Sequence, residues 1–240
     1  MQAVILAAGL GTRLRSIIGE DIPKVMMDLN GKPLLQYTVE ILKSKGIQDI
    51  SLIVHHKKEQ IMNFFGDGKK FGLSINYFYQ KNPKGGTADA VNYAREKITD
   101  KKFLLLYGDN IFDPQIIDRI LKEQVNFDGV IAVKEMQDVS KYGVVEVENH
   151  RVVSIIEKPE APVSNLVLTG LFVLPSVIFK FMDKVIPSKR NERELTDAIQ
   201  LLISNGFKIG YIKTQGFWMD PRDAKELEVA KQFIRENYGS

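Results

Sequence analysis

A short apolar run near the N-terminus restricts the fold of this chain more than any other feature. The run Ala3-Val4-Ile5-Leu6-Ala7 contains no polar residue and leads into a turn that contains Gly9 and Gly11. Continuous apolar runs of this length are typical of strands buried on both faces, as in parallel sheets covered by helices. The run is too short to span a membrane and follows no basic segment, so it does not resemble a signal peptide. We therefore expect a central strand here.

The rest of the chain alternates between strand and helix patterns. In the first half, strands are predicted at 50–54 and 103–107 and helices at 34–42 and 61–65. In the second half, strands are predicted at 129–133, 143–147, 152–156, 167–174 and 208–213, and helices at 176–182, 195–205 and 222–236. Asn149-His150 is predicted to join two of these strands in a tight turn. The pattern predicts an α/β fold, a Rossmann-like mixed, mostly parallel central sheet flanked by helices. No linker interrupts it, so we expect a single domain over 1–240.

Composition excludes several classes of chemistry. The 240 residues include no Cys and only 3 His, which excludes disulfides, thiol catalysis and Cys-ligated metals, so any metal is expected to be held by oxygen. The 33 Lys and Arg nearly balance the 30 Asp and Glu, without the basic excess typical of nucleic-acid binding. We expect a cytoplasmic protein that binds neither nucleic acid nor membrane.

The glycine-rich turn after the first strand favours anion binding. In Gly9-Leu10-Gly11-Thr12-Arg13-Leu14, missing side chains expose backbone N–H groups, and Lys24 follows behind Pro23. The turn lacks the third Gly of a dinucleotide motif and the Gly-Lys-Ser/Thr of a Walker A loop. A tight turn with solvated cations is the alternative to a triphosphate-binding loop.

These segments, together with Gly31-Lys32-Pro33-Leu34, resemble the N-terminal motif of the sugar-1-phosphate nucleotidylyltransferases, in particular the glucose-1-phosphate uridylyl- and thymidylyltransferases. The resemblance implies the nucleotide-diphospho-sugar transferase fold. It also implies that Arg13 meets the departing pyrophosphate and that Lys24 contacts the reacting phosphates, while Lys32 is expected to be a solvated charge. The residues of this region that the resemblance places at the nucleotide are Leu6, Ala8, Gly9, Gly11 and Thr12.

A second loop, from Gln80 to Ala90, resembles the base-reading segment of the family. The resemblance implies that Gln80, Gly85, Gly86 and Thr87 bind the nucleotide, with Gln80 and Gly86 bonding a pyrimidine edge. One additional residue lies between Gln80 and Gly86 relative to the thymidylyltransferases. Thr87 could instead be the N-cap of the following helix.

Two Asp residues are predicted to hold a Mg²⁺ cofactor. Gly108-Asp109-Asn110 follows the apolar strand at 103–107, so the Asp109 carboxylate lies at the mouth of the sheet, where it is well placed to bind Mg²⁺. Asp109 is expected to be catalytic with Arg13 and Lys24. Asp220, in Phe217-Trp218-Met219-Asp220, resembles the second metal carboxylate of the family. Relatives continue with Val-Gly-Thr, whereas Pro221-Arg222-Asp223 follows here, so Asp220 could instead be only a helix N-cap.

The sugar-phosphate side is predicted from resemblance alone. Gly143 and Gly170 would let the backbone reach sugar hydroxyls, Glu157 would bond a hydroxyl pair, and Lys158 would bind the phosphate. The segment 194–197 could cap a helix or contribute to the site. Arg190 and Arg193 are expected to be solvated charges that could also reach a phosphate, and the His residues receive no catalytic role.

The expected reaction condenses a nucleoside triphosphate, UTP or dTTP favoured, with a sugar 1-phosphate, glucose 1-phosphate favoured, and releases pyrophosphate. The phosphate of the sugar is already ionised and can attack without a covalent enzyme intermediate. The alternatives are a guanylyltransferase for mannose or heptose 1-phosphate and a non-catalytic nucleotide-binding domain of the same fold. We expect the catalytic domain alone, without the C-terminal β-helix domain of many relatives, and a homo-oligomer remains open.

Overall fold

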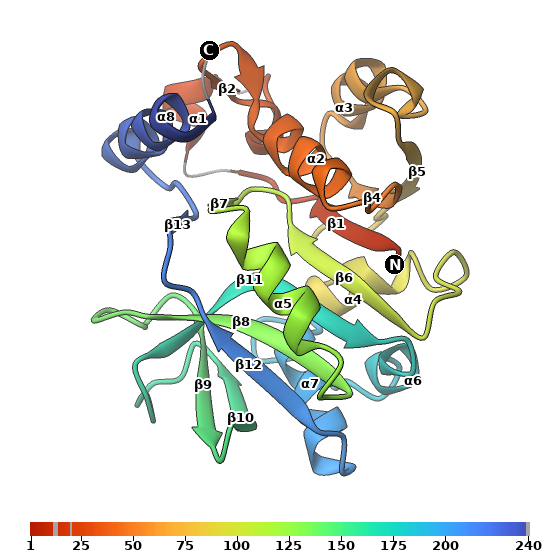
Figure 1. Cartoon of the computed structure of the whole chain (residues 1–240), viewed down its shortest axis with the longest axis vertical. Helices are drawn as coiled ribbons and strands as arrows, with labels where there is room; N and C mark the ends of the chain where they lie inside the picture. Colours follow the sequence, from red (N-terminus) through yellow and green to blue (C-terminus); the bar gives the residue numbers. More distant parts are fainter. Residues whose placement is uncertain (12–13, 20, 239–240) are drawn as a thin grey trace.

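One nine-stranded sheet forms the centre of the part of the chain that the structure describes, with strand order β5-β4-β1-β6-β11-β8-β12-β10-β9 (Figure 1). This computed structural model describes residues 1–11, 14–19 and 21–238, apart from the side chain of Arg15. The strands of the sheet are β1 (Ala3–Ala7), β4 (Asp49–Val54), β5 (Ser74–Tyr79), β6 (Lys102–Tyr107), β8 (Gly129–Glu135), β9 (Gly143–Glu148), β10 (Arg151–Glu157), β11 (Leu166–Pro175) and β12 (Ile209–Lys213). Two small sheets pair β2 (Asp28–Leu29) with β3 (Lys32–Pro33), and β7 (Ile111–Phe112) with β13 (Trp218–Met219).

The strand predicted from the N-terminal apolar run is confirmed as a central strand. β1 pairs in parallel with β4 on one side and with β6 on the other. Ala3, Val4 and Ile5 are completely buried because helices cover both faces of the sheet at this point. The carboxyl end of β1, and therefore the glycine-rich turn, lies at the same edge of the sheet as the ends of β4 and β6.

The sheet is mixed, as predicted. β5, β4, β1 and β6 are parallel, whereas β11 runs antiparallel between β6 and β8. β12 is parallel to β8, and the hairpin of β9 and β10 completes the far edge. The predicted tight turn of this hairpin is confirmed, since Asn149 and His150 have φ values of 48° and 63° in the left-handed region.

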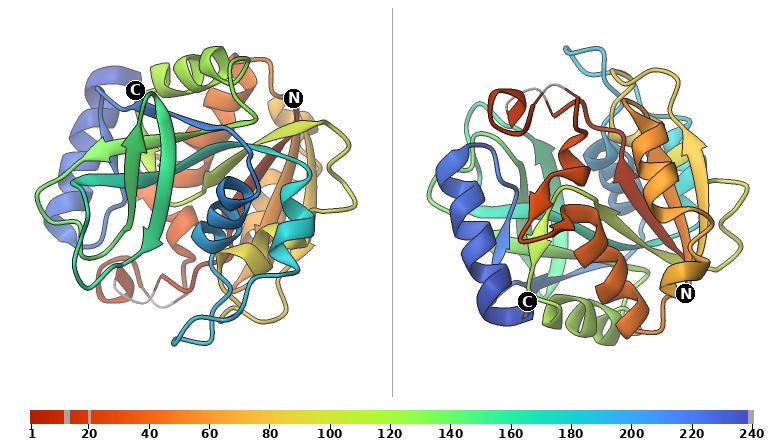
Figure 2. Two further views of the ribbon diagram at one scale, coloured as in Figure 1. Left: turned by 90° about the horizontal axis from the view of Figure 1, so that it is seen from below. Right: turned by 90° about the horizontal axis from the view of Figure 1, so that it is seen from above.

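Helices cover both faces of the sheet (Figures 1 and 2). They are α1 (Arg15–Ile18), α2 (Leu34–Ser44), α3 (Lys58–Phe65), α4 (Thr87–Asn92), α5 (Gln115–Glu123), α6 (Ile178–Met182), α7 (Leu195–Ser204) and α8 (Ala224–Tyr238). Buried side chains of α2, α3 and α5 form the core on one face, and those of α4, α6 and α7 form the core on the other. The apolar face of α8 packs on the N-terminal segment that includes α1 and β2. Within the described ranges, no helix has both the length and the hydropathy needed to cross a bilayer.

The structure differs from the sequence prediction at several element boundaries and contains strands that were not predicted, namely β5 of the central sheet and the short strands β2, β3, β7 and β13. β5 was not predicted, because it lies at the sheet edge and its partly exposed aromatic residues obscure the alternation. The last helix begins at Ala224 rather than at residue 222, since Asp223 Oδ1 accepts a hydrogen bond from the Glu226 N–H at 2.8 Å and thereby caps it. α3 begins earlier than predicted, directly after Lys57, whose φ is 54°.

Candidate functional site

A cavity of about 360 Å³ opens beyond the carboxyl ends of β1, β5 and β6, which is where ligands of α/β sheets bind. Most of the predicted site residues line it. They are Leu6, Ala8, Gly9, Gly11, Lys24, Gln80, Gly86, Thr87, Asp109, Gly143, Glu157, Lys158, Gly170 and Asp220. Gly85 does not line the cavity, and Thr12 and Arg13 lie outside the described residues. Residues from distant parts of the chain therefore share one cavity.

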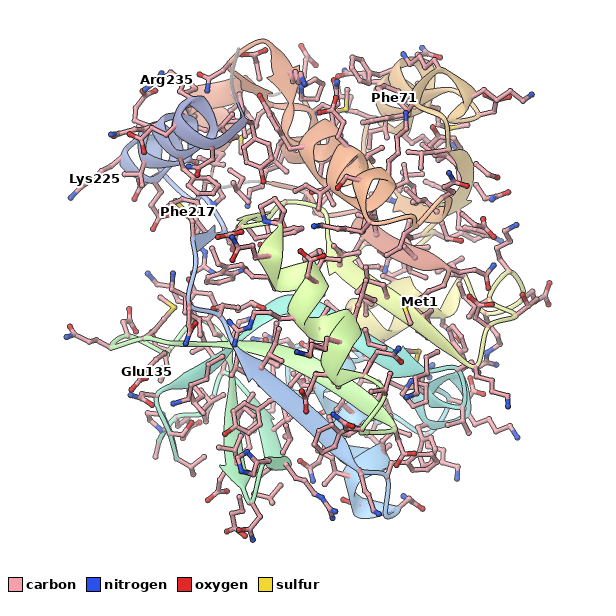
Figure 3. All side chains as sticks on the ribbon, in the orientation of Figure 1. Met1, Phe71, Glu135, Phe217, Lys225 and Arg235 are labelled. Atoms are coloured by element: carbon pink, nitrogen blue, oxygen red, sulfur yellow. The ribbon has the colours of Figure 1, made fainter. Side chains whose placement is uncertain are left out.

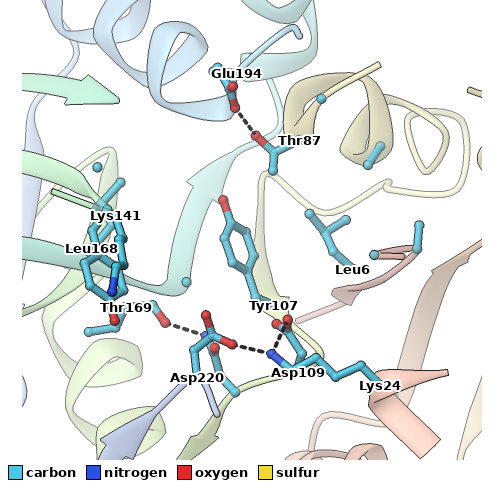
Figure 4. A pocket seen from close by; sticks show the side chains of 18 of the residues that line it. Leu6, Lys24, Thr87, Tyr107, Asp109, Lys141, Leu168, Thr169, Glu194 and Asp220 are labelled. Carbon is cyan, nitrogen blue, oxygen red and sulfur yellow. Dashed lines mark hydrogen bonds and ion pairs between the residues drawn. The ribbon is translucent and has the colours of Figure 1, made fainter. Parts of the chain in front are cut away.

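Lys24 lies between the two predicted metal carboxylates (Figure 4). Its Nζ donates to Asp109 Oδ2 at 3.0 Å and also forms an ion pair with Asp220 Oδ1. Burial would lower the pKa of this lysine, but Asp109 and Asp220 together raise it above its ordinary value. Gly11, at φ 58°, allows this arrangement, because a Cβ there would lie 2.9 Å from Lys24 Cβ. The backbone and Cβ of Lys24 therefore pack against the glycine-rich turn, while its ammonium group lies between the two carboxylates.

The carboxylates of Asp109 and Asp220 suit a Mg²⁺ ion. Both point at one cation from different strand ends, and carboxylate oxygens are the ligands that Mg²⁺ prefers. Within the described ranges, no cluster of three or more His, Cys, Asp or Glu residues could hold a metal. The donors offered to such an ion here are the two carboxylates of Asp109 and Asp220. The alternative role of Asp220 as a helix N-cap is wrong, since Asp223 caps α8.

One backbone carbonyl holds the neighbours of both carboxylates together. The Thr169 carbonyl accepts a hydrogen bond from Asn110 Nδ2 at 2.6 Å and another from Trp218 Nε1 at 2.7 Å. Asn110 directly follows Asp109, and Trp218 precedes Asp220 in the short strand that pairs with β7. Sequence reasoning missed this role of Asn110 and Trp218, although both lie within the motifs quoted for the metal carboxylates.

Gly170 explains how that carbonyl becomes available. Its φ is 76°, and a Cβ at this position would lie 2.6 Å from Asn110 Nδ2 and 2.8 Å from the ring of Tyr107. A side chain would therefore push Asn110 away from Thr169. The structure thus gives Gly170 a packing role beside the predicted contact with sugar.

Gln80 and Gly86 form the predicted base end of the cavity. Gln80 is 3% exposed, and its Nε2 donates to Asp89 Oδ2 at 3.1 Å and to the Gly86 carbonyl at 3.4 Å. Gly86 has φ 92°, and a Cβ there would lie only 2.3 Å from the Arg193 carbonyl oxygen. The base loop is joined to the segment before α7 through this close approach, and Gly85 contributes its carbonyl to Arg193 N at 2.8 Å.

The Thr87 hydroxyl does not cap its own helix, so that alternative is wrong. It accepts a hydrogen bond from the Leu195 N–H at 2.8 Å and donates to Glu194 Oε2 at 3.4 Å. Thr87 therefore links the start of α4 to the start of α7 at the cavity wall. Figure 4 shows this pair above Tyr107, whose pKa is raised by burial and by nearby carboxylates.

Glu157 and Lys158 lie at the predicted sugar-phosphate end. Lys158 Nζ is 3.1 Å from Glu157 Oε1, and burial raises the pKa of the Glu157 carboxyl despite this partner. A Cβ on Gly143 would lie 2.8 Å from Leu168 Cδ1 and 3.2 Å from Glu157 Oε2, so only glycine leaves room there. The cavity therefore presents a partly desolvated carboxylate beside a cation.

Glu194 is a cavity residue whose role the sequence left undecided. It is 5% exposed, and its Oε1 accepts a hydrogen bond from Arg190 Nη2 at 2.6 Å. Arg190 is therefore not only a solvated charge, because it neutralises a buried carboxylate. Lys32, which was expected to be a solvated charge, lies at the surface and there forms an ion pair with Glu40.

Comparison with known proteins shows the family of the chain. Residues 2–237 match the family described as Nucleotidyl transferase. The chain is 36% identical to the low-salt glycan biosynthesis nucleotidyltransferase Agl11 of Haloferax volcanii, over 99% of this chain and 67% of that protein. It is 37% identical to the UTP–glucose-1-phosphate uridylyltransferase AglF of the same organism, over 98% and 97% of the two chains.

The fold has a close counterpart among solved structures. A protein assigned as a glucose-1-phosphate thymidylyltransferase from Bacillus anthracis, solved in complex with sucrose, superposes with a TM-score of 0.85 at 27% identity, over 98% of this chain and 96% of that chain. The nucleotide-diphospho-sugar transferase fold is thereby confirmed. The chain belongs to the nucleotidyl transferase family and is an enzyme of the sugar-1-phosphate nucleotidyltransferase kind.

Proposed function

We propose that the protein condenses UTP or dTTP with glucose 1-phosphate, giving a nucleotide sugar and pyrophosphate, with Mg²⁺ held by Asp109 and Asp220. One observation carries the proposal. The base loop at Gln80 and Gly86, the cluster of Lys24 with the two Asp residues, and the Glu157-Lys158 pair all line the same cavity. A nucleotide and a sugar phosphate that share such a cavity would meet at their phosphates, beside the cations.

The choice of a pyrimidine base rests on Gln80 and on the relatives. Because Gln80 Nε2 already donates to Asp89, its carbonyl Oε1 is the atom that can receive a ring N–H, such as N3–H of uracil or thymine. The uridylyltransferase AglF matches along nearly its whole length. A glucose-1-phosphate thymidylyltransferase of Streptomyces antibioticus is 35% identical over 99% of this chain. These relatives also favour glucose 1-phosphate as the second substrate.

The proposed mechanism is a direct in-line displacement. A phosphate oxygen of the sugar 1-phosphate, already ionised near neutral pH, attacks the α-phosphorus, and the bond to the departing pyrophosphate breaks. No proton has to be removed, which fits a chain without Cys and with only 3 His. The main barrier is repulsion between two anions, so the protein's contribution is positioning and positive charge.

Each predicted residue has a role in that displacement. Lys24 and Lys158 neutralise the reacting phosphates, and Arg13 is proposed to meet the pyrophosphate. Glu157 accepts hydrogen bonds from sugar hydroxyls while Lys158 balances its charge. Mg²⁺ would supply additional neutralisation of the triphosphate when it is bound.

A coupled pyrophosphate assay tests the proposal. The enzyme is incubated with Mg²⁺, one of UTP, dTTP, GTP or ATP, and the 1-phosphate of glucose, N-acetylglucosamine or mannose, and pyrophosphatase then releases phosphate for detection. We expect the highest kcat/KM with UTP or dTTP and glucose 1-phosphate. A preference for GTP with mannose 1-phosphate would replace the proposal by a guanylyltransferase, and no release with any pair would favour a non-catalytic nucleotide-binding domain.

A further inference from the structure

Arg222 is a cavity residue that the proposed mechanism leaves without a role. It belongs to the segment Pro221-Arg222-Asp223, which directly follows Asp220. Its side chain is 16% exposed and lines the cavity next to Asp220. A mostly buried guanidinium beside a predicted metal carboxylate is not a solvated surface charge.

Contacts on three sides hold Arg222 in place. Its Nε and Nη2 each lie 3.0 Å from Asp220 Oδ2, so both donors converge on one oxygen. The guanidinium carbon lies 4.4 Å from the ring centroid of Tyr142, within the range of a cation–π interaction. The backbone N–H of Arg222 donates to Glu226 Oε2 at 2.7 Å. Arg222 therefore fixes Asp220 rather than following its movements.

The two oxygens of Asp220 have different partners. Arg222 takes Oδ2, whereas Oδ1 points to Lys24, the cation that also contacts Asp109. Among the described residues, the ion pairs of Asp109 and Asp220 are formed with Lys24 and Arg222, so two positive charges balance two negative ones. A free divalent cation meets little net attraction at such a neutral cluster.

Incoming phosphates change this balance. A triphosphate brings several negative charges to the glycine-rich turn next to Lys24, and the ammonium then has a second group of anions to contact. Lys24 is flexible beyond its fixed Cβ, whereas the guanidinium of Arg222 is held by Tyr142 and by its own backbone. Of the two cations, Lys24 is the one that can leave, and Oδ1 of Asp220 is the oxygen that it exposes.

We propose that Arg222 is a positioning residue that holds Oδ2 of Asp220, directs Oδ1 toward the metal position, and together with Lys24 keeps the carboxylate pair neutral until nucleotide phosphates arrive. The proposal rests on the proposed function, because it assigns Asp109 and Asp220 to the divalent cation. Its consequence is that the protein without nucleotide binds free divalent cations weakly, and that the positive charge of Arg222 is a cause of this weakness.

The test is Mn²⁺ binding to the whole protein without substrates, measured from the electron paramagnetic resonance signal of free Mn²⁺. Arg222→Met removes a positive charge next to Asp220. A charge at such a distance changes the cation affinity of a carboxylate by about tenfold or more, so we expect the variant to bind Mn²⁺ roughly tenfold more tightly than the wild type. Arg222→Gln keeps a hydrogen-bond donor and is expected to show the same direction. Arg222→Lys keeps the charge and is expected to bind Mn²⁺ as the wild type does.

A matched control removes a charge of the same sign from the same region. Lys225 is exposed at the start of α8 (Figure 3), and Lys225→Met is expected to leave Mn²⁺ binding unchanged. If Arg222 only supported the local fold, its loss would release Asp220 and Mn²⁺ would bind more weakly. Weaker or unchanged binding in the folded Met and Gln variants would overturn the proposal. The measurement contains no nucleotide or sugar phosphate, so its outcome is independent of whether pyrophosphate release is observed.

Discussion

Substitution of Gly170 by Ala tests the packing that positions the two carboxylates. The added Cβ would lie 2.6 Å from Asn110 Nδ2 and 2.8 Å from the Tyr107 ring. Asn110 is 3% exposed and cannot move without losing its 2.6 Å hydrogen bond to the Thr169 carbonyl. The added methyl group is therefore expected to displace Asn110 and, with it, the adjacent Asp109.

The expected loss of stability has two parts. The positive φ of 76° strains an L-residue by about 1–2 kcal/mol. The displaced Asn110 leaves a buried donor unpaired, which costs a further 1–3 kcal/mol or so. Together these predict a decrease of about 2–5 kcal/mol in the free energy of unfolding.

The assay is equilibrium unfolding in urea, with Gly206→Ala as the control. Gly206 also has a positive φ, 86°, but a Cβ there would meet no atom within 4 Å. The control therefore isolates the backbone strain, and the difference between the two variants reports the contact with Asn110 and Tyr107. If Gly170→Ala destabilises the protein no more than Gly206→Ala does, the argument that Gly170 seats Asn110 is refuted.

Three further substitutions test individual side chains. Asp109→Asn should leave the fold intact but lower kcat about 10²–10³-fold, as loss of one preorganised electrostatic contact typically does. A kcat within threefold of the wild-type value in the pyrophosphate assay would remove Asp109 from the mechanism. Trp218→Phe keeps a buried ring but loses the hydrogen bond to the Thr169 carbonyl, so it should lower the free energy of unfolding in urea by about 1 kcal/mol. It should also raise the Mg²⁺ concentration needed for half-maximal rate. An unchanged Mg²⁺ requirement would contradict the positioning role of Trp218. Burial raises the pKa of Glu157 in the folded protein, so protonation of this carboxyl favours folding. Its contribution to the free energy of unfolding is complete below the unfolded pKa near 4.5 and is lost as the pH rises through the folded pKa. Glu157→Gln should therefore equal the wild type in stability near pH 4 and exceed it at pH 8, while raising KM for the sugar phosphate, and a variant less stable at pH 8 would show that the charged form is favoured.

The central part of the fold could be predicted because its strands are buried on both faces. β1 and β6 contain continuous apolar runs and the run in β4 is interrupted only by Ser51, which is the pattern expected of strands buried on both faces. β5 was missed because an edge strand is covered incompletely, so Tyr77 and Tyr79 interrupt the apolar pattern without preventing pairing to β4. An apolar pattern in a sequence indicates burial, and edge strands are less buried than central strands, so their pattern is weaker.

The candidate site was predictable as a set of residues and not as a set of contacts. Lys24, Asp109 and Asp220 were each identified from local motifs. The contact of one ammonium group with both carboxylates depends on where the fold places the ends of strands that are distant in the sequence. Asp220 and Asp223 both precede α8 closely enough to cap it, and only the backbone geometry assigns the cap to Asp223. The role of the Thr169 carbonyl could not be predicted from the sequence, because every residue has a backbone carbonyl and residue type does not indicate which one accepts these hydrogen bonds.

The pairing of β13 with β7 also determines when the site can form during synthesis. Lys24 and Asp220 are 196 residues apart in the chain, and Phe217 must stack on Phe233 of α8, at 4.0 Å between ring centroids, in the same segment that carries Asp220. A nascent chain that ends before this segment already has the glycine-rich turn, Lys24 and Asp109, since chains emerge N-terminus first. Its ammonium has one carboxylate instead of two. The elements that complete the candidate site therefore leave the ribosome well after those that carry Lys24 and Asp109, and a nascent chain that stops before β13 and α8 cannot assemble it.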